Sequence, residues 1–409
     1  MDSIKRICVV GGGAAGMMAA GTSALYGADV TIFEHMTHLG KKLAITGKGR
    51  CNVTNNCTTD EFLDNVTKNP RFLYSALGAL STYDTMDLFE RLGVTLKTER
   101  GGRVYPDDDK AKTIVDAMRK YCSEARVIHE KVKTIKKNSD GTFSINSNPE
   151  YIFDSVILAT GGKSYPLTGS DGSGYRLAAK LGHTVSELIP SLIPINSPSS
   201  HCAEMQGLSL KNVSIRIVDN EDKVLYTDFG EMMFTHFGVT GPMILSASAH
   251  LRGKEMDTLT LSIDLKPALD EKTLDARLLS DFQANNNKDF VNALGGLLPS
   301  KMIQVFVKAC RVDARKKINA ITKEERKRIL ETLKDFRIPL SSYRPIEEAI
   351  ITSGGISVKE ISPSTMESKL VSGLYFAGEI IDVDAYTGGF NLQIAFSTGY
   401  LAGKSAAEY

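Results

Sequence analysis

The first 34 residues constrain the fold of this chain more than any other stretch, because they join five recognisable pieces in a fixed order. An apolar, β-branched run is typical of a buried parallel strand, and it leads directly into the glycine-rich sequence GGGAAG. A small-residue helix, a second apolar run and an acid follow. The pieces are the strand Ile4–Val10, the glycines Gly11, Gly13 and Gly16 at GxGxxG spacing, the helix Met17–Tyr26, the strand Asp29–Phe33, and Glu34. A glycine-rich turn alone is a weak signal, but the complete unit predicts a dinucleotide-binding fold.

Each piece of this unit has a physical task in holding a dinucleotide. Gly11 permits the tight turn, Gly13 lets the backbone approach a pyrophosphate, and Gly16 lets the helix pack closely on the strand. The N-terminus of the helix offers unpaired N–H groups and a positive dipole end to the phosphates. Glu34 can accept hydrogen bonds from both ribose hydroxyls, and its charge disfavours a 2′-phosphate. These residues do not distinguish FAD from NAD.

Composition and charge narrow the class of protein. The formal net charge is +1 over 409 residues, so we expect no extended nucleic-acid footprint and no nucleic-acid partner. The six cysteines are scattered without a CxxC pair, which predicts reduced thiols and a cytoplasmic protein. The uncharged stretch from Ile7 to Ala28 is rich in Gly and Ala and is interrupted by three consecutive glycines, so we expect no membrane insertion.

The remainder of the chain favours FAD over NAD. Short strands are expected near Ala125–Lys133, Thr142–Ser147 and Tyr151–Leu158, followed by Ala-Thr-Gly-Gly at 159–162. This three-strand meander resembles the FAD domain of glutathione-reductase-like flavoproteins, and the resemblance implies that the backbone at Thr160 and Gly161 passes close to FAD. Near the C-terminus, a strand ends in Gly378-Glu379 and a Gly-rich turn feeds a small-residue helix. The resemblance implies that this helix directs its N-terminal dipole at the flavin.

Five motifs, read in order, carry a resemblance to one family. They are GGGAAGMMAA, GKKLAITGKGRCNVTN, VILATGG, THFGVTGP and TMESKLVSGLYFAGEIIDVDAYTGGFN. They closely resemble the bacterial flavoproteins grouped as HI0933-like or BaiN-like. The resemblance implies an α/β fold, with a Rossmann-like, glutathione-reductase-type FAD domain carrying an inserted β-barrel-like lobe and an inserted helical lobe. Together with the change in composition after about Ser191, it predicts an FAD domain at 1–190 and 346–409, a β-rich lobe at 191–268 and a helical lobe at 269–345.

The same resemblance, with the dinucleotide motif, implies a set of residues that bind non-covalent FAD. They are Gly11, Gly13, Ala14, Ala15, Gly16, Glu34, Lys41, Lys42, Gly47, Arg50, Cys51, Asn52, Val132, Thr160, Gly161, Gly378, Glu379, Gly389, Phe390, Asn391 and Leu392. Lys41 and Lys42 are expected to reach the pyrophosphate, while Arg50 and Asn52 can hydrogen-bond the polar edge of the cofactor.

The stretch TGKGRCNVTNNC, residues 46–57, also invites other interpretations. A redox disulfide between Cys51 and Cys57 is disfavoured, because five residues separate them where the redox pair of glutathione-reductase relatives is separated by four. A metal site is disfavoured further, because no His or carboxylate stands nearby at ligand spacing. We therefore predict a loop beside the flavin and no metal. The basic run 311–317 and the segment KEERKR are interpreted as solvated helix faces.

Two residues are candidates for a catalytic proton donor. His236 lies in the Gly-rich stretch FTHFGVTGP, where it either donates a proton or only fixes the turn. Tyr386 lies just before the Gly pair that is expected to face the flavin. Both assignments remain open at this point.

Family resemblance implies a reaction class, with an alternative. The favoured activity is an FAD-dependent reductase of the ene-reductase type. It would act on an activated C=C bond conjugated to the 3-oxo group of a bile-acid- or steroid-like small molecule, with NADH or NADPH as a transient electron donor. The alternative is an aminoacetone oxidase that uses O2, and a flavin-bearing RNA- or partner-binding protein is a third class. GSDGSG at 169–174 has the wrong spacing for a second dinucleotide unit, so NAD(P)H would have to dock on the flavin itself. Sequence does not give the oligomeric state.

Overall fold

A computed structural model describes residues 4–146 and 149–408. The chain divides into two compact units, each with its own apolar core. Met1–Ser191 and Ile346–Tyr409 form the first unit, and Leu192–Pro345 form the second. The predicted three-segment division, with its additional border at 268, stays a prediction.

A five-stranded parallel sheet forms the centre of the first unit, in the order β21-β11-β1-β2-β7. Its strands are β1 (Arg6–Val10), β2 (Asp29–Phe33), β7 (Arg126–Ile128), β11 (Ser155–Leu158) and β21 (Leu374–Phe376). The four strands other than β7 are almost entirely buried, as their continuous apolar sequences predict for strands covered on both faces. The predicted α/β class with a Rossmann-type sheet is confirmed.

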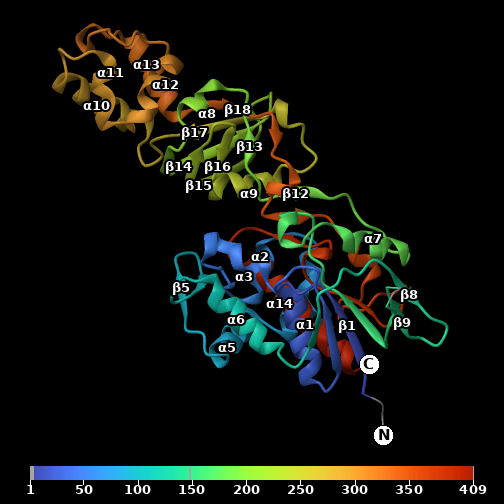
Figure 1. The fold of residues 1–409 in the computed structure, drawn as a ribbon. Helices are drawn as coiled ribbons and strands as arrows, with labels where there is room; N and C mark the ends of the chain where they lie inside the picture. Colours follow the sequence, from blue (N-terminus) through green and yellow to red (C-terminus); the bar gives the residue numbers. More distant parts are fainter. Residues whose placement is uncertain (1–3, 147–148, 409) are drawn as a thin grey trace. The chain divides into compact units, whose positions relative to one another are not determined.

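The two ends of the chain pack against each other through α1 (Ala14–Leu25) and α14 (Phe390–Glu408) (Figure 1). A methyl group added at Gly399 would lie 2.5 Å from the Ala15 carbonyl oxygen, and one added at Gly403 would lie 2.4 Å from that of Ala19. Only glycine lets the two backbones approach this closely. The small-residue sequences of both helices therefore serve one helix–helix contact, which brings the N-terminal and C-terminal motifs into one unit.

The strands before the ATGG sequence differ from the predicted meander. The first predicted strand is β7, which pairs in parallel with β2 instead of joining the meander. The antiparallel meander consists of β8 (Ile135–Lys137), β9 (Phe143–Ile145) and β10 (Tyr151–Phe153), and β11 follows as a separate strand. Ser147, in the second predicted strand, lies outside the described residues. The single run 151–158 is split because Ile152 pairs with β9 while Val156 pairs with β21.

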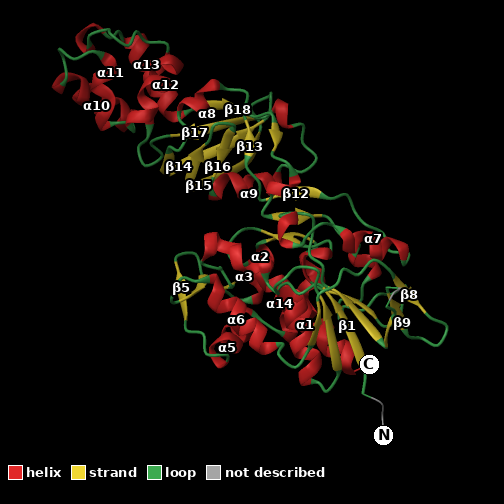
Figure 2. Ribbon diagram, viewed as in Figure 1, coloured by secondary structure: helices red, strands yellow, loops and turns green. Residues whose placement is uncertain are grey.

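Helices and short strands complete the first unit (Figure 2). The remaining helices are α2 (Lys41–Ile45), α3 (Thr59–Asp64), α4 (Tyr74–Ala79), α5 (Thr82–Arg91), α6 (Ala111–Tyr121) and α7 (Ser173–Lys180). The remaining strands are β3 (Thr54–Asn55), β4 (Val66–Lys68), β5 (Leu96–Glu99), β6 (Arg103–Pro106), β12 (Ile189–Ser191), β20 (Ile351–Ser353) and β22 (Asp384–Ala385). Capping boxes begin α3 and α5 at Thr58 and Ser81.

The second unit combines a seven-stranded antiparallel sheet, in the order β18-β17-β14-β15-β16-β13-β19, with helices. Its strands are β13 (Ile195–Asn196), β14 (Ser209–Val218), β15 (Val224–Phe234), β16 (Gly238–Thr240), β17 (Thr260–Asp264), β18 (Phe336–Pro339) and β19 (Ser342–Tyr343). Its helices are α8 (Ser200–Glu204), α9 (Pro242–His250), α10 (Glu271–Ala284), α11 (Phe290–Ala293), α12 (Ser300–Cys310) and α13 (Lys323–Lys334). The additional antiparallel sheet agrees with the predicted β-rich insertion. Pairing with β14 extends along almost the whole of β15.

Candidate cofactor and active site

The glycine-rich turn between β1 and α1 is closed on one side and open on the other. Gly11 has φ +103°, and a methyl group there would lie 2.5 Å from the Ala159 carbonyl oxygen. A methyl group at Gly16 would lie 1.8 Å from the Gly11 carbonyl oxygen. At Gly13, the N-cap of α1, such a group would meet no atom within 4 Å. The turn is thus packed tightly against the ATGG strand while the N-terminus of α1 faces open space, as binding of a pyrophosphate requires.

The Glu34 carboxylate lies beside this turn at the end of β2. Its Oε2 accepts a hydrogen bond from the Gly12 amide at 2.9 Å, and its Oε1 accepts one from the Met36 amide at 2.8 Å. Glu34 is 9% exposed. Two backbone donors therefore fix the carboxylate orientation, and its remaining lone pairs are available to ribose hydroxyls.

The loop that follows α2 has an unusual backbone. Lys48 and Cys51 both adopt positive φ, at 58° and 56°, which non-glycine residues rarely do. The Cys51 side chain is fully buried, and burial raises the pKa of its thiol to about 12. All six cysteines are free. Cys51 is therefore a neutral, packed side chain, and the structure contains no disulfide to Cys57.

Arg50 points to acidic neighbours in the structure. Its guanidinium donates to Glu99 and Asp109, each at 2.5 Å, and stacks on Tyr105 at 4.2 Å. The hydrogen bonds from Arg50 lower the pKa of Glu99, and those from Lys97 and Arg50 lower the pKa of Asp109. Contact between Arg50 and a flavin stays a prediction, because this arrangement already occupies much of the guanidinium.

Two of the buried oxygens that have no hydrogen-bond partner among the described residues belong to predicted cofactor residues. They are Oδ1 of Asn52 and Oγ1 of Thr160, both predicted to contact the cofactor. A buried polar atom without a partner costs about 1–3 kcal/mol, so such atoms usually serve a ligand or a water molecule. Together with the open N-terminus of α1 and the position of Glu34, these two atoms fit the predicted FAD.

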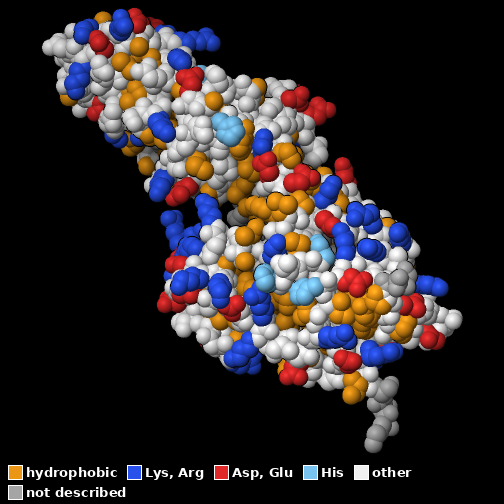
Figure 3. Space-filling view, viewed as in Figure 1, with side chains coloured by type: hydrophobic (Ala, Val, Ile, Leu, Met, Phe, Trp, Pro, Cys, Tyr) orange, Lys and Arg blue, Asp and Glu red, His pale blue; other side chains and the backbone are white. Residues whose placement is uncertain are grey.

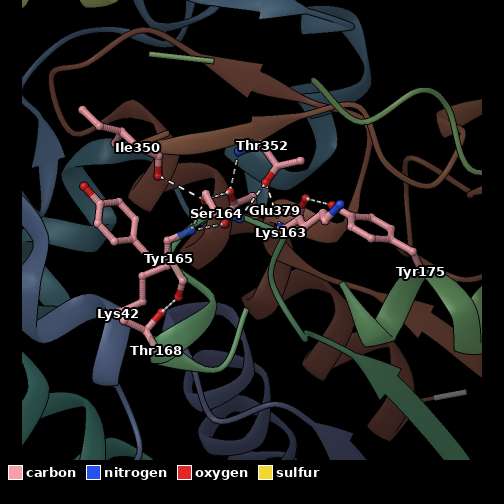
Figure 4. Close-up of polar contacts among 9 residues, drawn as sticks. All are labelled: Lys42, Lys163, Ser164, Tyr165, Thr168, Tyr175, Ile350, Thr352 and Glu379. Atoms are coloured by element: carbon pink, nitrogen blue, oxygen red, sulfur yellow. Dashed lines mark hydrogen bonds and ion pairs between the residues drawn. The ribbon is translucent and has the colours of Figure 1, made fainter. Parts of the chain in front are cut away.

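A polar network connects four segments that are distant in the sequence (Figure 4). Lys42 Nζ donates to Ser164 Oγ at 2.7 Å and to Glu379 Oε2 at 2.8 Å. Glu379 Oε1 accepts from the Thr352 amide at 2.8 Å, and Thr352 Oγ1 accepts from the amides of Lys163 and Ser164. The structure thus brings the predicted residues Lys42 and Glu379 together as an ion pair that fixes the loop after ATGG.

The C-terminal motif forms a braced turn at the start of α14. Asn391 Nδ2 donates to the carbonyls of Ala385 at 2.8 Å and Tyr386 at 3.1 Å, while its Oδ1 accepts from the Ala385 amide at 3.0 Å. Phe390 is buried edge-on against Phe62, with ring centroids 5.2 Å apart. The predicted residue Asn391 therefore fixes the backbone of Ala385 and Tyr386.

The other predicted cofactor residues lie in the same unit at different depths. Ala15, Val132 and Gly378 are buried, whereas Ala14, Lys41, Gly161, Gly389 and Leu392 are half-buried and Gly47 is exposed. A methyl group at Gly378 would lie 2.7 Å from Ala15 Cβ, so the C-terminal strand end abuts the first turn of α1.

The structure places the two candidate proton donors in different units. Tyr386 is half-buried in the first unit, and its amide donates to the Asn65 carbonyl at 3.0 Å. His236 is exposed in the second unit, edge-on to Phe237 at 5.0 Å. The geometry within the first unit therefore connects only Tyr386 to the predicted flavin-binding segments.

Sequence reasoning missed Gln393, which is 0% exposed. Its Nε2 donates to the Leu80 carbonyl, Thr85 Oγ1 and Ser397 Oγ, and its Oε1 accepts from Thr54 Oγ1. The only available signal was an amide side chain within an otherwise small and apolar helix. Ser164 and Thr352 were missed as well, because their partners are distant in the sequence.

Two features are absent from the part of the chain that the structure describes. None of its helices combines the length and the apolar character needed to cross a membrane. Nor do these residues include a group of three or more His, Cys, Asp or Glu side chains that could hold a metal ion.

Comparison with known proteins gives a family and relatives of full length. The family model described as HI0933-like protein Rossmann domain matches residues 5–405. A 3-dehydro-bile acid delta(4,6)-reductase of Clostridium scindens is 29% identical, over 99% of this chain and 100% of the relative. A ribosomal RNA dihydrouridine synthase of Escherichia coli K12 is 28% identical, over 96% of this chain and 95% of the relative.

Among solved structures, a 3-ketosteroid-delta4-(5alpha)-dehydrogenase of Rhodococcus jostii RHA1 in complex with 4-androstene-3,17-dione aligns with a TM-score of 0.54. The alignment covers 100% of this chain and 98% of that chain at 15% identity. At this identity the likeness extends to the fold alone.

Proposed function

The chain belongs to the HI0933-like family, and we propose that it is an FAD-dependent reductase of carbon–carbon double bonds conjugated to a carbonyl group. One observation carries this proposal. The names of the two full-length relatives describe the same type of reaction on very different substrates.

The two substrates share one electronic feature. In a 3-dehydro-bile acid with delta(4,6) double bonds, the C=C bonds are conjugated to the 3-ketone. In uridine, the C5=C6 bond that is saturated in dihydrouridine is conjugated to the C4 carbonyl. Each accepts a hydride at the carbon distant from the carbonyl and a proton at the carbon next to it. The common requirement is therefore a two-electron donor and a proton donor on a polarised C=C bond.

FAD, when bound, supplies the two electrons as hydride. The residues that would hold it are the turn around Gly13, Glu34, Asn52 and Thr160, with the N-terminus of α14 near the ring. Support comes from the open helix N-terminus at Gly13 and from the two buried oxygens without partners. NADH or NADPH is the proposed electron source, docking without a second nucleotide-binding domain.

We assign the proton to Tyr386 in preference to His236. Asn391 and Asn65 hold the Tyr386 backbone on both sides, so the backbone that carries the phenol is fixed. A tyrosine can donate a proton to a developing enolate when it is placed within hydrogen-bond reach. His236 stays the alternative donor.

The first candidate substrate is a bile-acid- or steroid-like enone, which the Clostridium scindens relative favours. The second is uridine in ribosomal RNA, which the Escherichia coli relative favours. If the second is correct, the predicted absence of a nucleic-acid partner is wrong. That prediction is untested so far.

Anaerobic mixing tests the proposal directly. Purified protein reconstituted with FAD is mixed with NADH or NADPH while the flavin absorbance near 450 nm is followed. The reduced protein is then offered a 3-oxo-Δ4,6 steroid or deproteinised ribosomal RNA. In a separate experiment, the oxidised protein is offered aminoacetone. We expect bleaching by a nicotinamide and reoxidation by one of the first two compounds. Bleaching by aminoacetone alone, with peroxide formed in air, would establish the oxidase alternative instead.

A further inference from the structure

The helical part of the second unit carries an excess of positive charge that the reductase chemistry does not use. Residues 300–334 contain eleven Lys or Arg and four Asp or Glu, a net charge of +7, whereas the whole chain has +1. This segment covers α12, α13 and the connection between them. Figure 3 shows Lys and Arg side chains on the visible face of this part of the unit. The balanced total charge therefore hides a strongly basic region.

A cleft of about 910 Å³ opens in the same unit between the β14–β17 part of the sheet and α12 and α13. Four cations line it: Arg216, Arg311, Arg328 and Lys334. The hydroxyls of Ser214, Thr227 and Thr332 also line it. Cations and hydroxyls are the side chains that contact phosphate and sugar in nucleic-acid complexes.

The acids in the cleft are largely paired with cations, two of which also line it. Lys334 pairs with Asp264 at 2.5 Å, Arg337 pairs with Asp335 at 2.7 Å, and Arg216 lies 3.7 Å from Asp335. Glu331 lies 3.7 Å from Lys327. Only Glu271 among the lining acids is without such a pair in the described part of the chain.

Arg311 and Arg328, in contrast, form no ion pair with a carboxylate of the described residues. Arg311 is the C-cap of α12, with φ 55°. Among the described residues, the Arg328 guanidinium makes only long hydrogen bonds, to the Cys310 carbonyl at 3.4 Å and the Arg311 carbonyl at 3.5 Å. Both side chains are exposed. An exposed guanidinium without a carboxylate partner can donate hydrogen bonds to a phosphate without first breaking a salt bridge.

We propose that this cleft, with Arg311 and Arg328 as its free cations, binds the phosphate backbone of RNA. The inference rests on the ribosomal RNA candidate for the proposed function, and it assigns a residue-level surface for that partner. RNA fits better than a small anion because the basic segment extends along two helices and their connection. A linear polyanion can neutralise many such cations at once.

Fluorescence anisotropy of a fluorescein-labelled 20-nucleotide oligouridylate tests this surface on the full-length FAD-bound protein, with deproteinised ribosomal RNA as competitor. The test variant is Arg311→Gln/Arg328→Gln. The matched control, Lys223→Gln/Lys254→Gln, removes two exposed cations of the same unit outside the cleft. Loss of two phosphate contacts should make the plot of log K, the association constant, against log[KCl] less steep by about 1.4. It should also raise Kd roughly 25-fold at 0.1 M KCl. The control should change neither.

Arg311→Lys/Arg328→Lys keeps the charge, and should keep most of the affinity if the Gln variant loses binding for electrostatic reasons. Absence of binding by the wild-type protein, or equal losses in the test and control variants, would overturn the proposal. Flavin bleaching by NAD(P)H is recorded on the same samples. If bleaching fails while the variants behave as stated, the reductase function falls and the RNA surface stands.

Discussion

Thr54 Oγ1 donates a hydrogen bond to Gln393 Oε1 at 2.6 Å, across 339 positions of sequence. Thr54 belongs to the GKGRCNVTN loop and Gln393 to the first turns of α14. One buried amide therefore sets the distance between the two motifs that are expected to hold the flavin ring.

Gln393→Leu should destabilise the protein by about 2–4 kcal/mol, because it removes the side-chain partner of the buried Thr54 and Thr85 hydroxyls. It should also weaken FAD binding, because the Thr54 loop loses its anchor to α14. Urea unfolding of the apoprotein and fluorescence titration with FAD measure the two effects. The control is Gln304→Leu, at an exposed position of α12, which should do neither. Unchanged FAD affinity in Gln393→Leu would show that the hydrogen bond is not needed for the cofactor.

Gly389 is a second point of contact between the same two segments. It has φ +96°, and a methyl group there would lie 2.2 Å from the Thr54 carbonyl oxygen. Gly389→Ala should therefore lower the free energy of unfolding by about 3 kcal/mol or more, because backbone strain and overpacking combine. Gly93→Ala is the matched control, since Gly93 has φ +91° but no atom within 4 Å of such a methyl group. It should cost only about 1–2 kcal/mol. Equal losses in thermal unfolding would mean that the Thr54 carbonyl moves away easily.

Thr160→Val should affect the apoprotein and the binding of FAD in opposite ways. Because Thr160 Oγ1 is buried without a partner, its replacement by a methyl group should leave apoprotein stability unchanged or raise it by about 1 kcal/mol. FAD affinity should fall roughly tenfold, the effect of one lost hydrogen bond. Thr352→Val is the contrast, since Thr352 Oγ1 accepts two backbone hydrogen bonds and its loss should destabilise the apoprotein too. A destabilised Thr160→Val apoprotein would argue that the hydroxyl has a protein partner.

Tyr386→Phe tests the proposed proton donor. Reduction of the flavin by NAD(P)H should be unaffected, while reoxidation by the enone substrate should slow about 10²–10⁴-fold. Stopped-flow absorbance separates the two half-reactions. Tyr83→Phe, at a 49% exposed position, should change neither rate. If Tyr386→Phe reoxidises normally, His236→Gln is the next variant, and a slowed rate there would move the role to His236.

Stability should fall as the pH drops through the range in which His183 titrates. His183 Nε2 lies 2.9 Å from Ser368 Oγ, and its Nδ1 lies 3.3 Å from Glu360 Oε2. Burial lowers the pKa of His183, an effect that Glu360 partly opposes. The unfolded chain, with a pKa of about 6.5, then binds the proton before the native protein does. This histidine therefore reduces stability below about pH 6.5, by at most about 1.4 kcal/mol per pH unit.

Urea unfolding at pH 7.5 and 5.5 measures this pH dependence. The difference between the two pH values should be smaller for His183→Gln than for the wild-type protein, and unchanged for His38→Gln, at an exposed position. A His183→Gln variant with the full wild-type pH dependence would assign the effect to other groups.

The sequence by itself determined the elements whose signals are local. The run from Ile4 to Glu34 specifies β1, the turn, α1 and β2. The apolar pattern and the glycine spacing that predict these elements all lie within about thirty residues. The Gly-rich start of α14 and the apolar run of β11 are predictable for the same reason. The two stretches around Thr160 and Asn52 were recognised as motifs, although nothing local showed that their side-chain oxygens would be buried without partners.

Only the tertiary structure decided which distant residues meet. Strand β7 joins the parallel sheet rather than the meander because β2 offers it a free edge, which no local pattern records. Lys42 pairs with Glu379, and Gln393 with Thr54, across more than 330 positions of sequence. The basic segment 300–334 is visible in the sequence, but the pairing of most of its cations and the freedom of Arg311 and Arg328 arise from packing. Long-range contacts of this kind depend on the whole fold, because each partner is placed by a different element.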